Sequence, residues 1–166
     1  MRLDFSFIAL MALVAGCASV PVATLPHPTR EFPADAFITQ RAVLTALGRQ
    51  YPMNGYLARS ASGGQRLVIT ENFGNVMADV LVKPDGSVQV MRASPALHRS
   101  WIERYVTSDL KCIFGGGTET NCPGQMLSPT HFIIQRRWYK LDLQIVEIKP
   151  GSQSPAMFEE KPLGAP

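Results

Sequence analysis

The sequence predicts an α+β fold in which a curved antiparallel sheet, an open half-barrel, packs on one main helix. Between residues 36 and 93, apolar and polar residues alternate along short segments that turn signals separate. This pattern is typical of strands with one buried and one solvated face. A later segment changes to helical spacing, and alternation then returns. An antiparallel sheet of this kind buries its apolar face by curling around a helix.

Five segments before the helix have the period-two alternation of β-strands. They are residues 36–48, 53–59, 65–71, 76–83 and 87–92. The turn signal Pro84-Asp85-Gly86 separates the last two, which are therefore expected to form a hairpin. After the helix, residues 131–135 and 138–148 alternate again and are expected as one long strand or two short ones.

A helix is predicted from Pro95 to Ile113, because apolar residues recur there at every fourth position. Its packing residues are expected to be Trp101, Ile102, Val106 and Leu110. A run of glycines directly after the segment ends the helix. The apolar stripe is broad, so this helix requires a sheet to pack on.

The amino terminus has the features of an export signal. An apolar run from Phe5 to Ala15 precedes Cys17 and, at about a dozen residues, is shorter than the roughly 20 that span a bilayer. The segment resembles the bacterial lipobox, which implies lipidation of Cys17 and removal of residues 1–16. In Gram-negative bacteria the following Ala18 favours the outer membrane. The alternative is an ordinary signal that is cleaved at a nearby small residue.

The composition divides the rest of the chain into three parts. Residues 17–35 begin with the lipidated cysteine and are rich in proline, which favours extended chain, so they are predicted to form a tether. Residues 36–149 are predicted to form the half-barrel domain. Residues 150–166 are again rich in proline, lack apolar periodicity and are predicted to be a disordered tail.

Cys112 and Cys122 remain once Cys17 is assigned to the lipid, and a disulfide between them is predicted. An exported protein enters a compartment that permits disulfides, and the glycine-rich turn between the two cysteines allows them to approach. On the chain-entropy model, closing this ring stabilises the fold by roughly 3 kcal/mol. A zinc site is disfavoured because no paired histidine motif accompanies the cysteines. A redox centre is disfavoured because no C-x-x-C motif is present.

The sequence contains no recognisable catalytic or metal-binding motif, so the protein is predicted not to be an enzyme and to need no cofactor or metal. His27, His98 and His131 lack the spacing to a second histidine or carboxylate that a metal set requires. No G-x-S-x-G motif occurs, and no G-K-[ST] follows the glycine run. A hydrolase would require His98 or His131 to meet a nucleophile and an acid in one pocket.

The net charge of +3 is small, and the basic runs of nucleic-acid-binding proteins are missing from the sequence, so no nucleic-acid partner is expected. Arg136, Arg137 and Lys140 form a basic cluster that is expected on a solvated strand face. Contact of this cluster with anionic lipid headgroups is the alternative. Asp109 is expected to cap or to pair locally with a basic residue of its own helix.

The order of these elements resembles a family of bacterial outer-membrane lipoproteins whose members look like the LolA/LolB superfamily. The resemblance depends mainly on the helical stretch from Trp101 to Lys111, with its internal Asp-Leu pair, and on Arg137-Trp138-Tyr139. It covers residues 36–149. It implies an open antiparallel barrel covered by helices, with a concave apolar cavity that holds acyl chains.

The function implied by this resemblance is that of a lipid-anchored, periplasm-facing outer-membrane protein that binds or carries a lipid or acyl chain. An incomplete barrel leaves an apolar interior, and concave apolar sites bind lipids. The expected cavity residues are Leu67, Ile69, Val80, Val82, Val90, Leu141 and Leu143, with Met53, Met77, Met91 and Met126 as adaptable neighbours. A closed core is an equally good interpretation of the same residues. The alternative function is a non-enzymatic accessory or scaffold protein that binds an envelope protein through the sheet edge or the Trp101 face of the helix.

Overall fold

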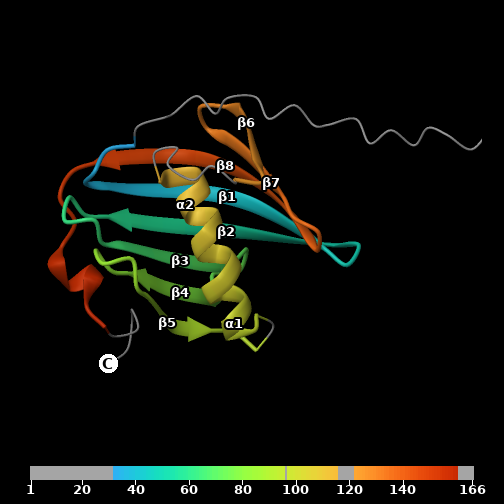
Figure 1. Cartoon of the computed structure of the whole chain (residues 1–166), viewed down its shortest axis with the longest axis horizontal. Coiled ribbons are helices and arrows are strands. Elements are labelled where there is room, and N and C mark those ends of the chain that lie inside the picture. The colour runs from blue at the N-terminus through green and yellow to red at the C-terminus, as the bar shows by residue number, and fades with distance from the viewer. Residues whose placement is uncertain (1–31, 96, 116–121, 161–166) are drawn as a thin grey trace, which may run out of the picture.

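A computed structural model describes residues 32–95, 97–115 and 122–160 of the chain. These residues form eight strands and one main helical segment, shown in Figure 1. The strands are β1 (Ala36–Ala46), β2 (Arg49–Arg59), β3 (Gln65–Glu71), β4 (Val76–Val82), β5 (Val88–Ala93), β6 (Gly124–Ser128), β7 (His131–Gln135) and β8 (Tyr139–Pro150). The helices are α1 (Arg99–Trp101), a π-helical turn η1 (Ile102–Val106), α2 (Thr107–Phe114) and, after β8, a short 3-10 helix η2 (Pro155–Phe158).

The strands form one antiparallel sheet in the order β5-β4-β3-β2-β1-β8-β7-β6. Because β5 and β6 are its two edges, the sheet does not close into a barrel. The segment α1–η1–α2 crosses one face of the sheet (Figure 1). The predicted α+β class, an antiparallel sheet packed on one main helix, is therefore confirmed.

One apolar core fills most of the space between the sheet and the helix. Of the four helix residues named for packing, Ile102, Val106 and Leu110 are buried in this core, and Trp101 packs against it. The first and last strands of the sequence are neighbours, since β1 pairs with β8 along almost its whole length. This long-range pairing places the chain's final strand beside its first one, directly beneath the helix.

The helical segment begins later than the sequence predicts. It starts at Arg99 and not at Pro95, because His98 has an extended backbone with a ψ of 132°, and before it the Leu97 amide forms a turn with the Ser94 carbonyl at 3.0 Å. The helix ends at Phe114, one residue after the predicted end.

The largest differences from the predicted strands are at β2 and β6. β2 runs through Pro52, which pairs with β1 but lies before the first residue that pairs with β3, Met53. Proline lacks an N–H donor and is tolerated where one side of a strand has no partner. No strand is predicted from the sequence at residues 124–128, where β6 lies. In the structure β6 pairs with β7 and forms one edge of the sheet.

The predicted tether extends to Asp35, but its last residues belong to the folded domain. Phe32 is buried in the core, and its ring centroid lies 4.9 Å from that of Phe114 and 6.5 Å from that of Phe132. An aromatic side chain gains free energy by this burial, which proline-rich composition does not reveal. The predicted signal peptide, Cys17 and the first part of the tether lie outside the described residues.

The prediction of a disordered tail is wrong for residues 150–160, of which Pro150 ends β8. Arg66 of β3 and Asp79 of β4 point away from the helix, because their neighbours in each strand lie in the core. Arg66 donates from Nε and Nη2 to Asp79 at 2.8 and 2.7 Å, and from Nη1 to the carbonyls of Met157 and Glu159 at 3.0 and 3.2 Å. A buried arginine thus holds this segment on the sheet. The rest of the predicted tail lies outside the described residues.

Candidate functional site

An apolar cavity of about 70 Å³ lies between the sheet and the helical segment. Its wall is formed by β1, β2, β3 and β8 on the sheet side, and by the helix with the residues directly before it on the other. Most lining side chains are aliphatic or aromatic, and Gln40, Asn54 and Asp109 are the amide and carboxyl residues among them. Such a wall favours an apolar ligand, which a small number of polar groups can orient.

The predicted cavity residues divide into two groups. Those that line the cavity are Leu67, Ile69, Leu141 and Leu143. Val80, Val82 and Val90 belong to β4 and β5, and they are buried in the core or packed against it without lining the cavity. Of the four methionines, Met53 lines the cavity. Alternation along a strand predicts the face on which a residue lies, but the position of that strand in the sheet decides whether it reaches the cavity.

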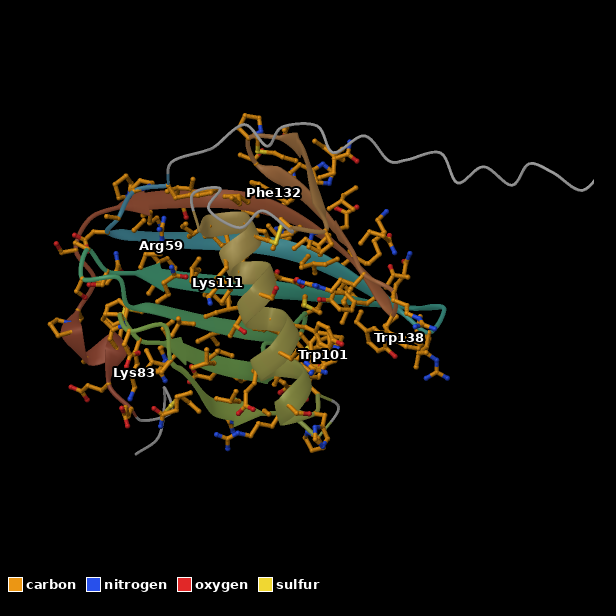
Figure 2. All side chains as sticks on the ribbon, viewed as in Figure 1. Arg59, Lys83, Trp101, Lys111, Phe132 and Trp138 are labelled. Atoms are coloured by element: carbon orange, nitrogen blue, oxygen red, sulfur yellow. A yellow bond between two sulfur atoms is a disulfide. The ribbon has the colours of Figure 1, made fainter. Side chains whose placement is uncertain are left out.

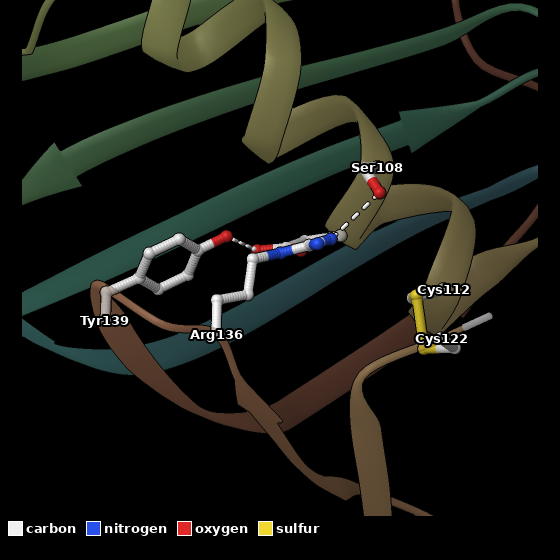
Figure 3. The surroundings of a disulfide bond; sticks show 6 residues. Ser108, Cys112, Cys122, Arg136 and Tyr139 are labelled. Carbon is white, nitrogen blue, oxygen red and sulfur yellow. Dashed lines mark hydrogen bonds and ion pairs between the residues drawn. A yellow bond between two sulfur atoms is a disulfide. The ribbon is translucent and has the colours of Figure 1, made fainter.

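A buried carboxylate forms part of the cavity wall. Asp109 on α2 receives a hydrogen bond from the Tyr139 hydroxyl at 2.6 Å, and Arg136 donates to its other oxygen from Nε and Nη2 at 2.9 and 2.7 Å. Arg136 Nη2 also donates to Ser108 Oγ at 2.9 Å, as Figure 3 shows. The prediction that Asp109 pairs within its own helix is therefore wrong, since the β7–β8 connection supplies its cation.

This environment changes the acid–base behaviour of the cluster. Burial raises the pKa of the Asp109 carboxyl, although the hydrogen bonds from Tyr139 and Arg136 act in the opposite direction. Burial and the contact with Asp109 together raise the pKa of Tyr139 well above its ordinary value. Both oxygens of Asp109 already have donors. We therefore infer that the cluster of Asp109, Tyr139 and Arg136 holds the helix on the sheet.

Three aromatic rings pack beside this cluster. The centroid of Tyr139 lies 5.4 Å from that of Trp101 and 5.8 Å from that of Tyr105, both in edge-to-face geometry. The rings of Trp101 and Tyr105 lie 5.9 Å apart. Such pairs stabilise packing beyond the area they bury. Trp101 and Tyr139 also line the cavity, so this aromatic packing forms part of its wall.

Gln40 and Gly55 form a polar feature that the sequence analysis missed. They are partners in the β1–β2 pairing, and both line the cavity. A Cβ atom on Gly55 would lie 2.5 Å from Gln40 Nε2, so the amide occupies the space that a side chain at position 55 would need. A glutamine on the apolar face of a strand, with a glycine inside the next strand, is a signal that could have been noticed.

The helix is also held at its carboxyl end. Cys112 of α2 and Cys122, just before β6, are joined by a disulfide with their Cα atoms 5.4 Å apart (Figure 3). This separation lies in the usual range for such bonds. The helix is thus fixed near its end by the disulfide and near its middle by Asp109.

Two turns meet at one end of the sheet. Ala46, the last residue of β1, pairs with Arg49 of β2 and with Tyr139 of β8. The β1–β2 turn at residues 47–48 therefore lies next to the β7–β8 connection at residues 136–138. In Figure 2 the label of Trp138 marks this end of the sheet.

We call the exposed residues at this end the basic-aromatic tip: Leu47, Arg49, Tyr51, Arg137 and Trp138. Leu47 is 91% exposed and Trp138 is 62% exposed. The Arg137 guanidinium lies 4.7 Å from the centroid of the Trp138 ring, a cation–π contact. Leu47 also has a φ of 50°, a left-handed conformation that a side chain of this type rarely adopts. The exposed side chain of Leu47 therefore adds little to the packing of the core.

The described histidines lie away from the cavity. His98 Nδ1 is 2.8 Å from Ser100 Oγ, and His131 Nε2 is 2.8 Å from Asp142 Oδ1. The Ser100 hydroxyl thus lies beside His98 and the Asp142 carboxylate beside His131. None of these four residues lines the cavity. In residues 32–95, 97–115 and 122–160, no cluster of histidine, cysteine and acidic side chains could hold a metal ion.

Neither a protein-family model nor a curated protein matches this chain. In the part of the chain that the structure describes, no helix has the length and apolar character needed to cross a membrane. The cavity and the basic-aromatic tip are therefore the features from which a function can be proposed.

Proposed function

We propose that this protein is a lipid-anchored, periplasm-facing protein of the outer membrane that binds or carries a lipid or acyl chain beneath its helix. The observation that supports this best is the apolar cavity between the open sheet and the helical segment. The resemblance to the LolA/LolB superfamily agrees with a ligand of this kind. Acylated Cys17 would keep the domain next to the bilayer from which such a chain is taken.

The size of the cavity limits what it accepts without a change of shape. A water-sized group needs roughly 10–15 Å³, so about 70 Å³ admits a short stretch of chain rather than a whole acyl chain. A longer chain requires the helix to move. Its carboxyl half is tied to the rest of the domain by Cys112 and Asp109, whereas Trp101 near its start contacts Tyr139 through ring packing. We therefore propose that the cavity widens at the Trp101 end.

The test uses residues 17–166 with Cys17→Ala, which keep every described residue and lack the expected lipid anchor. This protein is secreted into the periplasm of a Gram-negative bacterium, purified without detergent and examined by native mass spectrometry. We expect a co-purifying lipid, which Ala42→Leu removes because Ala42 lines the cavity. Ala93→Leu, at an exposed position of β5, is the matched control. Empty protein that also takes up no added phospholipid or fatty acid would contradict the proposal.

The basic-aromatic tip gives the proposal a second line of support. Exposed tryptophan and tyrosine favour the interface of a bilayer, and arginines favour anionic headgroups. Contact with anionic headgroups is also the alternative that the sequence allows for the cluster of Arg136, Arg137 and Lys140. Since Arg136 is bound to Asp109, Arg137 is the member of the cluster that the tip presents.

The second candidate is an accessory lipoprotein that binds an envelope protein. It is favoured by β6, an edge strand on which Leu127 is exposed. An edge strand presents unpaired backbone groups that can add a strand from a partner. If this candidate is correct, cross-linking from position 127 in membranes should give one stoichiometric partner, and Ala42→Leu should leave that partner bound.

A further inference from the structure

Gln40 is an amide on the apolar face of β1. It is 4% exposed, and Ile38 and Ala42 on the same face belong to the core. Its Oε1 has no hydrogen-bond donor among the described residues. The residue lines the cavity, where Asp109 by contrast has donors on both of its oxygens. An unmatched buried acceptor therefore belongs to a residue of the cavity wall, most of which is apolar.

The neighbouring strand is adapted to this amide. Gly55 is the β2 partner of Gln40, and a Cβ atom there would lie 2.6 Å from Gln40 Cγ and 2.9 Å from its Cδ. The glutamine side chain thus lies across the backbone of Gly55. Any other residue at position 55 would displace it, so the two positions together hold the amide in the cavity wall.

A buried carbonyl without a donor destabilises a folded protein, and nearly all such groups in native proteins have a partner. An apolar side chain of similar size at position 40 would avoid this penalty and pack with the core. A ligand that donates a hydrogen bond inside the cavity would also remove the penalty, and it would do so only when bound. The chemistry of the wall therefore favours a ligand with one donor within an apolar body.

We propose that the ligand of this cavity is an aliphatic chain with a hydroxyl or amide N–H group, which donates a hydrogen bond to Gln40 Oε1. This inference rests on the proposed function, because it specifies the chain that the cavity holds. Gln40 then acts as the residue that distinguishes such a chain from a plain hydrocarbon.

Two isomeric probes test the inference directly. 1-Nonanol and 1-methoxyoctane contain the same atoms, but only the alcohol can donate a hydrogen bond. Binding is followed by the fluorescence of Trp101, which lines the cavity, in residues 17–166 with Cys17→Ala and Trp138→Phe. We expect nonanol to bind about tenfold more tightly than its isomer.

Gln40→Leu should abolish this preference by weakening nonanol binding while the ether binds as before. Gln144→Leu, the same exchange at an exposed position of β8, should keep the preference. If both isomers bind equally to the protein that keeps Gln40, the inference is overturned and the proposed function stands. If neither binds, the inference is overturned too, and the proposed function fails with it only where added phospholipid and fatty acid are not taken up either. The comparison of isomers needs no variant at position 40, so it remains decisive if Gln40→Leu does not fold.

Discussion

The Tyr139 hydroxyl donates a hydrogen bond of 2.6 Å to Asp109 Oδ2 and so joins the first residue of β8 to the helix. Both residues are buried, and Arg136 occupies the other carboxylate oxygen. The contact holds α2 at a fixed place along the sheet. Because both residues also line the cavity, the same hydrogen bond defines part of its wall.

Tyr139→Phe should lower the free energy of unfolding by about 1–2 kcal/mol near pH 7, because it leaves a buried carboxylate oxygen without its donor. The pKa of Tyr139 is raised in the folded state, so the folded protein holds this proton more tightly than the unfolded chain. The stabilisation is therefore complete below about pH 10 and is lost as the pH rises further. Urea denaturation at about pH 7 and about pH 10.5 should show that the difference between the two proteins shrinks.

Tyr51→Phe is the control for this experiment, because the Tyr51 ring is exposed. It should leave the stability near pH 7 unchanged. A difference between wild type and Tyr139→Phe that stays constant over this pH range would show that the hydroxyl of Tyr139 titrates no differently after unfolding.

Reduction of the Cys112–Cys122 bond should lower the free energy of unfolding by about 3 kcal/mol, because the reduced unfolded chain regains the entropy of an open loop. Chemical denaturation with and without a phosphine reductant measures the change. The double variant Cys112→Ser/Cys122→Ser is expected to unfold like the reduced protein. Its free energy of unfolding should not change when the reductant is added. If the reductant still lowers the free energy of unfolding of that variant, its effect arises elsewhere in the chain.

Gly55→Ala should destabilise the protein by about 1–3 kcal/mol, because the new Cβ atom would overlap the Gln40 side chain. Combining it with Gln40→Ala removes the overlapping atoms and should recover most of this loss. Thermal unfolding of the two single variants and the double variant gives the coupling energy. Additive effects would mean that the two side-chain positions do not interact.

Deletion of residues 155–166 should lower the free energy of unfolding by about 1.5–3 kcal/mol, because the Met157 and Glu159 carbonyls accept charged hydrogen bonds from buried Arg66. Deletion of residues 161–166 alone keeps both of these contacts and should destabilise the protein less than the longer deletion. Both deletions are compared by urea denaturation. An equal loss from the shorter deletion would contradict the role assigned to these carbonyls.

Leu47→Gly should have opposite effects on stability and on membrane binding. Glycine adopts the φ of 50° at this turn without strain, so the fold should gain about 1 kcal/mol. Loss of the exposed leucine, or Trp138→Ala, should weaken flotation of the Cys17→Ala protein with anionic phosphatidylglycerol vesicles. Val146→Ala, an exposed position on β8 outside the tip, is the control. Equal flotation of all these proteins would show that the basic-aromatic tip does not contact the membrane.

Local patterns predicted much of the fold. Strand alternation placed β3 and β7 at their observed ends, and the Pro84-Asp85-Gly86 signal predicted the β4–β5 hairpin. These features depend on residues close in sequence, so composition and spacing are enough to identify them. β6 and the docked segment after β8 were missed, because their partners are not local.

The candidate site was only partly predictable for the same reason. Leu67 and Leu143 were named from their strand faces and line the cavity, whereas Val80 on an equivalent face does not. The difference arises from the order of strands in the sheet, which the sequence of a single strand does not determine.

By itself, the sequence determined the α+β class, the main helix with its apolar stripe and most of the strands, because backbone preference and burial periodicity are properties of short segments. Only the tertiary structure decided that β1 pairs with β8, that Tyr139 and Arg136 meet Asp109, and that Gln40 lies in the cavity wall with no donor to its Oε1 among the described residues. These relationships join residues far apart in the chain. They depend on strand order, register and the position of the helix, which are fixed when the whole core packs together.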